Sequence, residues 1–300
     1  MKSETKSYFY VHFAVFLFGF TGILGQLIEL PAIILVWWRA LLTWVLLIPY
    51  MLYSGAFSHF DKQNFKIFSR IGILVALHWI CFYGSIKLAN ASVAMICLAT
   101  IPVLTAFFEA WTSKKAILWR DAFIGIVTLP GILLINQSIP DNFRLGFFVG
   151  LIAAALSALF ASYNKKHITK ADPILITWIE LFSVWIFISV LLPGLYWFKP
   201  ETAFLPSYND WWYIILLSLF CTVFAYVLAL KAMKFLSAFS VMLAFNMETV
   251  YGILLSMIFL QEHKQLGGLF YLGVIIIMVS LFIDPILKKS KNAFSNKEIN

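Results

Sequence analysis

Charged residues are scarce in this chain. Asp, Glu, Lys and Arg make up 12% of the 300 residues, while 62% are hydrophobic. A soluble domain, with one core and a hydrated surface, carries about 25% charged residues. The composition therefore excludes an ordinary soluble domain and predicts an all-α integral membrane protein, with the lipid bilayer as a partner.

Signatures of enzymatic or metal chemistry are also missing. The three cysteines, Cys81, Cys97 and Cys221, lie inside apolar runs without C-x-x-C spacing, which argues against a disulfide framework or a zinc site. No H-E-x-x-H, G-x-S-x-G, Walker motif or pair of aspartates at metal-binding spacing is present. We expect no enzyme, no catalytic residue, no metal and no cofactor. The alternative is an integral membrane enzyme acting on a lipid or membrane-embedded substrate.

The net charge of +8 does not indicate nucleic-acid binding, because the basic residues form short clusters between apolar runs. These apolar runs predict about ten transmembrane helices. The expected spans are Phe9 to Ile28, Ala32 to Tyr53, Phe68 to Leu88, Ser92 to Trp111, Asp121 to Asn136, Gly146 to Asn164, Ile174 to Trp197, Trp211 to Leu230, Leu236 to Leu260 and Gly267 to Leu287.

The basic residues also predict the orientation. With a cytoplasmic N-terminus, 17 of the 22 Lys and Arg residues fall on the cytoplasmic side. Only Lys87, Arg144, Lys199 and Lys264 fall outside, and Arg39 lies within a span. The positive-inside rule therefore predicts a multi-pass protein of the plasma or inner membrane with both termini in the cytoplasm.

Glu248 is the principal candidate for a binding residue. It lies about twelve residues into the apolar run from Leu236 to Leu260, which puts it near the bilayer midplane. A carboxylate at that depth is costly unless it faces a protein interior or a water-filled cavity. We expect a substrate site here, with Asn246 and Tyr251 nearby. The alternative is a protonated glutamate that only bonds to another helix.

The two halves of the chain resemble each other. Trp37-Trp38-Arg39 followed by Trp44 aligns without gaps on Trp178-Ile179-Glu180 followed by Trp185, and Ser92 to Pro102 aligns on Ala238 to Glu248. Five spans per half means that the second half enters the membrane from the other side, so the repeats are inverted. We expect repeats at 1–137 and 138–290 and a tail at 291–300.

These features resemble the EamA-type members of the drug/metabolite transporter superfamily. The resemblance rests on Leu30-Pro31 through Trp38-Arg39-Ala40, on the Ala-Asn-Ala-Ser-Val-Ala segment before Ile101-Pro102-Val103, and on Gln261-Glu262. The family usually ends spans four and nine with Gly-Glu, whereas span four here ends with Ser113-Lys114-Lys115. The resemblance implies a secondary transporter without a cofactor, often an exporter of amino acids, other metabolites or toxic compounds.

Other polar side chains within the spans are further candidates. Arg39 is expected in the outer half of the membrane, where it either lines a vestibule, or reaches the interface or bonds to helix-end carbonyls. Its repeat mate Glu180 is expected in the inner half. The pair fits gates on either side of a central site. Glu109 either belongs to this charged set or pairs with a nearby lysine. Thr222 and Tyr226, with Ser157 and Asn164, are expected to line a polar cavity that faces Glu248; helix packing is the alternative. His78, bordered by Trp79, is a further candidate for substrate binding, and a hydrogen-bonded core histidine is the alternative.

The predicted function is a secondary transporter that exports amino acids, small metabolites or drug-like compounds by alternating access. The accompanying hypothesis is that Glu248 couples substrate movement to protonation.

Overall fold

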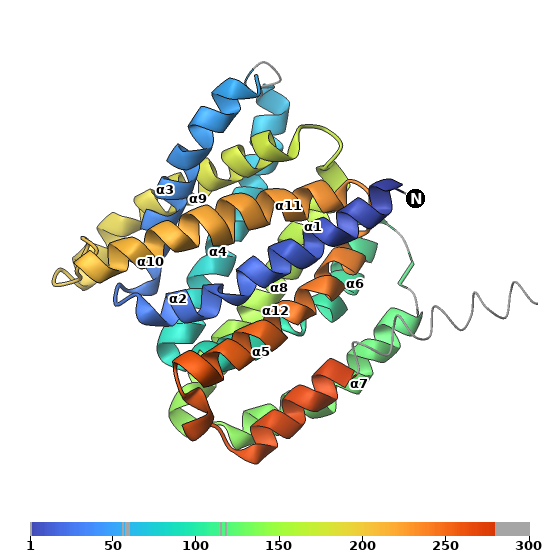
Figure 1. Ribbon diagram of the computed structural model, residues 1–300, viewed down its shortest axis with the longest axis vertical. Coiled ribbons are helices and arrows are strands. Elements are labelled where there is room, and N and C mark those ends of the chain that lie inside the picture. Colours follow the sequence, from blue (N-terminus) through green and yellow to red (C-terminus); the bar gives the residue numbers. More distant parts are fainter. Residues whose placement is uncertain (1, 56, 58–60, 115, 118, 280–300) are drawn as a thin grey trace, which may run out of the picture.

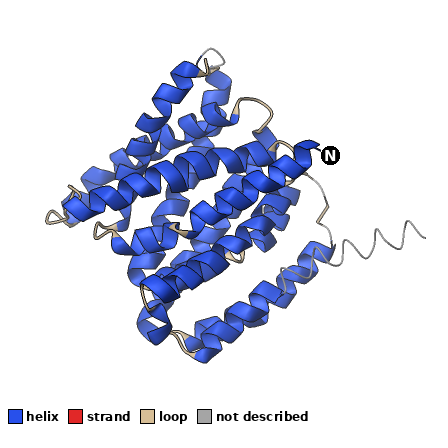
Figure 2. Cartoon of the chain, in the orientation of Figure 1, coloured by secondary structure: helices blue, strands red, loops and turns tan. Residues whose placement is uncertain are grey.

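All regular structure is helical, without a strand, in the part of the chain that the computed structural model describes (Figure 2). The described part excludes residues 1, 56, 58–60, 115, 118 and 280–300, and also the side chains of residues 2–4, 119–122, 124, 125, 128, 238, 239, 242, 243 and 246. The expected tail 291–300 and the end of the last expected span lie outside it.

Two of the expected spans in the first half are interrupted helices. The helices are α1 (Lys2–Gly19), α2 (Thr21–Leu27), α3 (Ala32–Tyr53), α4 (Lys62–Leu88), α5 (Ala91–Leu98), α6 (Ile101–Ser113) and α7 (Trp119–Ser138). The first span breaks at Phe20 and the fourth at Ala99 and Thr100. Pro102 follows the second break in the first turn of α6, where its missing N–H is tolerated.

The second half contains one span with an irregular centre. Its elements are η2 (Asp141–Phe143), α8 (Arg144–His167), α9 (Pro173–Phe198), α10 (Tyr208–Ser218), η3 (Leu219–Phe224), α11 (Ala225–Met233), α12 (Ala238–Phe259), η4 (Glu262–Lys264) and a helix over residues 268–279. The segment η3 is a π-helix that joins α10 to α11, so the spacing of Thr222 and Tyr226 along the chain is not that of a regular α-helix.

Polar residues cap several of these helices and explain where they begin. The side chain of Asp61 accepts a hydrogen bond from Asn64 N at the start of α4, and Asp172 accepts one from Ile174 N at the start of α9. Ser207 and Asp210 form a reciprocal capping box at the start of α10.

Seven helical segments are long and apolar enough to cross a membrane, by length and composition, within the described residues. They are Thr5–Leu27, Ala32–Tyr53, Lys62–Leu88, Ala91–Ser113, Asp141–His167, Pro173–Phe198 and Tyr208–Met233, with Met247–Phe259 and Gly268–Val279 as shorter apolar helices. The all-helical membrane architecture is confirmed, and the count of ten spans stays a prediction.

The aligned tryptophans of the two halves meet each other. The ring centroids of Trp37 and Trp185 are 6.1 Å apart and those of Trp44 and Trp178 are 5.7 Å apart, while Trp44 stacks on Trp185 at 5.6 Å. Exchanging each tryptophan for its repeat mate turns the first contact into the second. The earlier tryptophan of the α3 pair, Trp37, contacts the later one of the α9 pair, Trp185, so the two helices run antiparallel. A half-turn about an axis perpendicular to the helices requires this arrangement.

A second symmetric contact joins α7 to the helix over residues 268–279, at one edge of the molecule (Figure 1). A methyl group on Gly131 would lie 2.7 Å from Ile277 Cγ1 and 2.9 Å from the Gly273 oxygen. A methyl group on Gly273 would lie 2.6 Å from Ile135 Cγ1 and 2.9 Å from the Gly131 oxygen. Only glycine permits two backbones to cross this closely.

Candidate functional site

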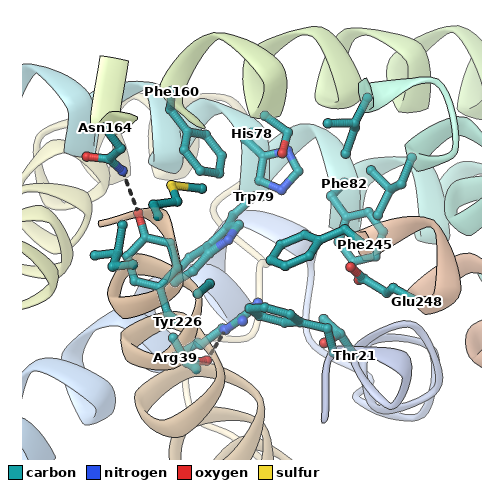
Figure 3. A pocket seen from close by; sticks show the side chains of 18 residues that line it. Thr21, Arg39, His78, Trp79, Phe82, Phe160, Asn164, Tyr226, Phe245 and Glu248 are labelled. Carbon is teal, nitrogen blue, oxygen red and sulfur yellow. Dashed lines mark hydrogen bonds between the residues drawn. The ribbon is translucent and has the colours of Figure 1, made fainter. Parts of the chain in front are cut away.

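A small cavity lies among the helices of both halves (Figure 3). Its volume is about 70 Å³. The lining residues are Phe18, Thr21, Arg39, His78, Trp79, Phe82, Leu98, Ile101, Ser157, Phe160, Asn164, Thr222, Tyr226, Ala229, Leu230, Met233, Phe245 and Glu248. Because α1 packs against α11 and α12, while α4 and α6 pack against α8, these side chains point into one shared space.

Glu248 lies at the centre of the 22-residue helix α12 and is 8% exposed. Among the described contacts, its carboxylate takes part in no ion pair or hydrogen bond, and it faces the cavity. No described contact therefore supports the alternative in which Glu248 only bonds to another helix. Close packing on this helix comes instead from Gly252, which lies against Met95, and from Thr249, whose hydroxyl donates to the Met95 oxygen at 3.0 Å.

Three hydrogen bonds and one ring contact hold Arg39 in the cavity wall. Its Nε donates to Thr222 Oγ1 at 2.8 Å, its Nη1 to Tyr83 OH at 2.5 Å and its Nη2 to the Cys221 oxygen at 3.3 Å. The guanidinium carbon lies 4.0 Å from the centroid of the Trp79 ring, a cation–π contact. A guanidinium has five N–H donors, so these bonds leave two for a ligand among the described contacts.

This position corrects one expectation for Arg39. The side chain is only 2% exposed, so it does not reach the membrane interface. The hydroxyls of Thr222 and Tyr83 and the carbonyl in the π-helix hold the charge inside the protein. Arg39 thus lines the same cavity as Glu248, without an ion pair between them in the described part of the chain.

His78 stands among aromatic rings that form the apolar part of the wall. Its Nδ1 lies 2.8 Å from the Ala153 oxygen and donates the hydrogen bond, because a carbonyl oxygen can only accept. The imidazole stacks on Phe82, with centroids 6.2 Å apart, and meets the edge of Phe160 at 5.5 Å. Together with Trp79 and Phe245, these rings give the cavity a mostly apolar lining (Figure 3).

Glu180 lies behind the cavity wall and contacts it through Tyr226. The Tyr226 hydroxyl donates to Glu180 Oε2 and accepts from Asn164 Nδ2, and both Tyr226 and Asn164 line the cavity. The pair resembles Arg39 and Tyr83 of the first half, and the sequence alignment of the two halves pairs Arg39 with Glu180. Each half therefore contains one buried ionisable side chain bonded to one tyrosine.

The structure brings together most of the expected cavity residues. Glu248, His78, Trp79, Thr222, Tyr226 and Arg39 all line the cavity, as do Ser157 and Asn164. The side chain of Asn246 lies outside the described part, and Glu109 does not line the cavity. Tyr251 turns towards α1, where it meets the edge of Phe16 at 5.9 Å, because Gly19 leaves room for it. Tyr251 does not line this cavity, and its role in substrate binding stays a prediction.

The sequence interpretation missed Tyr83 and the phenylalanines of the cavity wall. The chain contains 30 Phe and 12 Tyr residues, most of them in apolar runs, so no pattern singled these out. Within the described residues, no group of three or more His, Cys, Asp or Glu side chains is placed to hold a metal ion.

Comparison with known proteins identifies the family. The model of the EamA-like transporter family matches residues 5–137 and 144–283. The chain belongs to the EamA-like transporter family. At the level of the family, the protein is therefore a membrane transporter with a small-molecule substrate. No curated protein matches the chain.

A solved structure titled "Crystal structure of protein" has a similar fold. It is 13% identical, covers 95% of this chain and 98% of its own, and superposes with a TM-score of 0.68. At this identity the likeness concerns the arrangement of helices alone.

Proposed function

We propose that this EamA-like transporter carries a small zwitterionic or cationic substrate, such as an amino acid, and exports it across the plasma or inner membrane by alternating access. One observation carries the proposal: a guanidinium and an unpaired carboxylate, from Arg39 and Glu248, face one buried cavity without bonding to each other. A buried charge without a partner is costly, and a ligand with opposite charges would relieve that cost.

The cavity offers a place for each part of such a ligand. The free N–H groups of Arg39 would bind a carboxylate, and Glu248 would bind an ammonium group. The rings of Phe82, Phe160 and Phe245 would contact an apolar side chain. A volume of about 70 Å³ holds only a few water molecules, so these wall side chains must move apart when the substrate enters.

The proposed architecture is ten spans in two inverted five-helix repeats, 1–137 and 138–290. The antiparallel tryptophan and glycine contacts support it, because an in-plane twofold axis relates mates in this way. Arg39 with Tyr83 and Glu180 with Tyr226 are then symmetry-related pairs at the cavity wall. We assign them to the rearrangements that open each side in turn.

Proton coupling at Glu248 completes the proposal. A carboxylate that binds the substrate ammonium in one state and a proton in the other would exchange the two as the cavity opens to either side. No described contact occupies the Glu248 carboxyl group, so it is available to the substrate ammonium group and to the proton.

A metabolite comparison tests transport and substrate class together. Cells producing the wild-type chain are compared with cells producing Arg39→Gln or Glu248→Gln at equal membrane levels. We expect zwitterionic or cationic metabolites to accumulate in the medium with the wild type only. If the affected metabolites were all anions, or if both variants exported as much as the wild type, the cavity assignment would be wrong.

A further inference from the structure

A lateral groove lies between α4 and α8, apart from the central cavity. Its lining consists of Ile67, Arg70, Ile71 and Leu74 from α4 and Leu159, Tyr163 and His167 from α8, and its volume is about 410 Å³. None of these residues lines the central cavity. We propose that this groove binds one anionic phospholipid of the bilayer, with the phosphate at Arg70 and His167.

The lining changes from polar to apolar along the helices. Arg70 is the last charged residue of α4 before a stretch without Asp, Glu, Lys or Arg that continues to Lys87, and His167 ends α8 after Lys165 and Lys166. Leu74 lies one turn deeper than Arg70, and Leu159 lies two turns before His167. This order matches a phospholipid, whose phosphate lies at the membrane surface and whose chains lie below it.

The charge of the groove favours an anion. Arg70 is exposed and makes no ion pair or hydrogen bond among the described contacts, and Lys66 lies one turn before it on the same face. His167 Nδ1 is buried without a hydrogen-bond partner in the described part of the chain. The nearby Asp61 and Asp172 cap the N-termini of α4 and α9, and the groove lining itself contains no carboxylate.

The apolar floor favours a lipid over a soluble anion. Ile71 is buried, while Ile67, Leu74 and Leu159 are partly exposed within the groove. A free phosphate would leave these side chains uncovered, whereas an acyl chain would cover them. Basic pockets between helices on the cytoplasmic side are typical sites for anionic headgroups, and positive-inside counting places this end of α4 there.

Lipid retention during native mass spectrometry tests the proposal. The full chain is purified in detergent and supplied with phosphatidylglycerol or phosphatidylcholine of the same acyl chains. We expect one phosphatidylglycerol to be retained in preference to phosphatidylcholine. Arg70→Gln should weaken phosphatidylglycerol binding about fivefold, the effect of one surface cation on an anionic lipid. Lys234→Gln removes an exposed cation that does not line the groove and should leave binding unchanged.

Two further variants separate the possible results. His167→Gln removes the second phosphate partner and should also weaken phosphatidylglycerol binding, and Leu159→Trp should lower retention by filling the groove. Equal retention of both lipids, or equal loss from Arg70→Gln and Lys234→Gln, would overturn the proposal. Complete competition by soluble glycerol phosphate would also overturn it, because the groove would then bind a free anion.

Discussion

Arg39 and Glu248 show how far single residues could be predicted. Both stood out because a charge within an apolar run is costly and needs a reason. Their meeting in one cavity depends on how α3 and α12 pack against other helices, which no local pattern contains. The turn of Tyr251 towards α1 was unpredictable for the same kind of reason, since it depends on the space left by Gly19.

Glu262 joins the two halves at a helix end. It is 2% exposed, and its two carboxylate oxygens accept hydrogen bonds from Ala91 N at 3.0 Å and from Ser92 N at 2.8 Å. Asn90 caps the next N–H of α5, that of Val93. The first N–H groups of α5 are therefore satisfied from the opposite half of the chain, where negative charge also suits the helix dipole.

Replacing this carboxylate should destabilise the protein. Glu262→Ala leaves two buried N–H groups without acceptors, and we expect a loss of about 2 kcal/mol and a lower melting temperature in detergent. Glu201→Ala, at an exposed loop position, is the control and should melt like the wild type. Equal melting of Glu262→Ala and the wild type would show that the cap contributes nothing.

The helices follow the spans expected from the sequence closely, but the breaks within the spans were not expected. The span Ala32 to Tyr53 agrees with α3 residue for residue, because Pro31 marks its start and a long apolar run follows. The π-helix at Leu219–Phe224 and the break at Thr100 were not predicted, since the apolar pattern continues through both. Such irregularities are stabilised by tertiary contacts, here including the bond from Arg39 to the Cys221 oxygen.

The crossing of α7 with the helix over residues 268–279 provides a test at this scale. Gly273→Ala would force a methyl group against Ile135 and the Gly131 oxygen, and overpacking of this kind costs about 1–3 kcal/mol. We expect a lower melting temperature. Gly194→Ala is the matched control, because nothing lies within 4 Å of its added methyl group. If both variants melted alike, the close crossing would be absent from the protein.

For the whole molecule, the repeat was predicted from two aligned segments, the tryptophan pattern around Arg39 and Glu180 and the alignment of Ser92 to Pro102 on Ala238 to Glu248. The pattern aligned Trp37 and Trp44 with Trp178 and Trp185, and the structure places these four side chains in symmetric contact. Sequence could not show that the halves meet through these very residues. Nor could it reveal that Arg39 and Glu180 each bond to a tyrosine on the next span.

The orientation of the chain is testable by cysteine labelling. Asn142 and Asn209 are exposed, and the proposed topology puts both outside the cell. In a cysteine-free background, Asn142→Cys and Asn209→Cys should react with an impermeant thiol reagent on intact cells, and Lys170→Cys only after the membrane is opened. The reverse pattern would invert the topology.

The measurement that tests the central claim most directly is pH-driven transport by reconstituted Glu248→Gln protein. The substrate is the one identified by the metabolite comparison, and equal melting temperatures establish that the variant is folded. Glutamine keeps the shape of the side chain but cannot exchange a proton, so we predict that the wild type moves substrate against its gradient under a pH difference and that Glu248→Gln does not. Uphill movement by Glu248→Gln at the wild-type rate would contradict the proposed role of the cavity carboxylate.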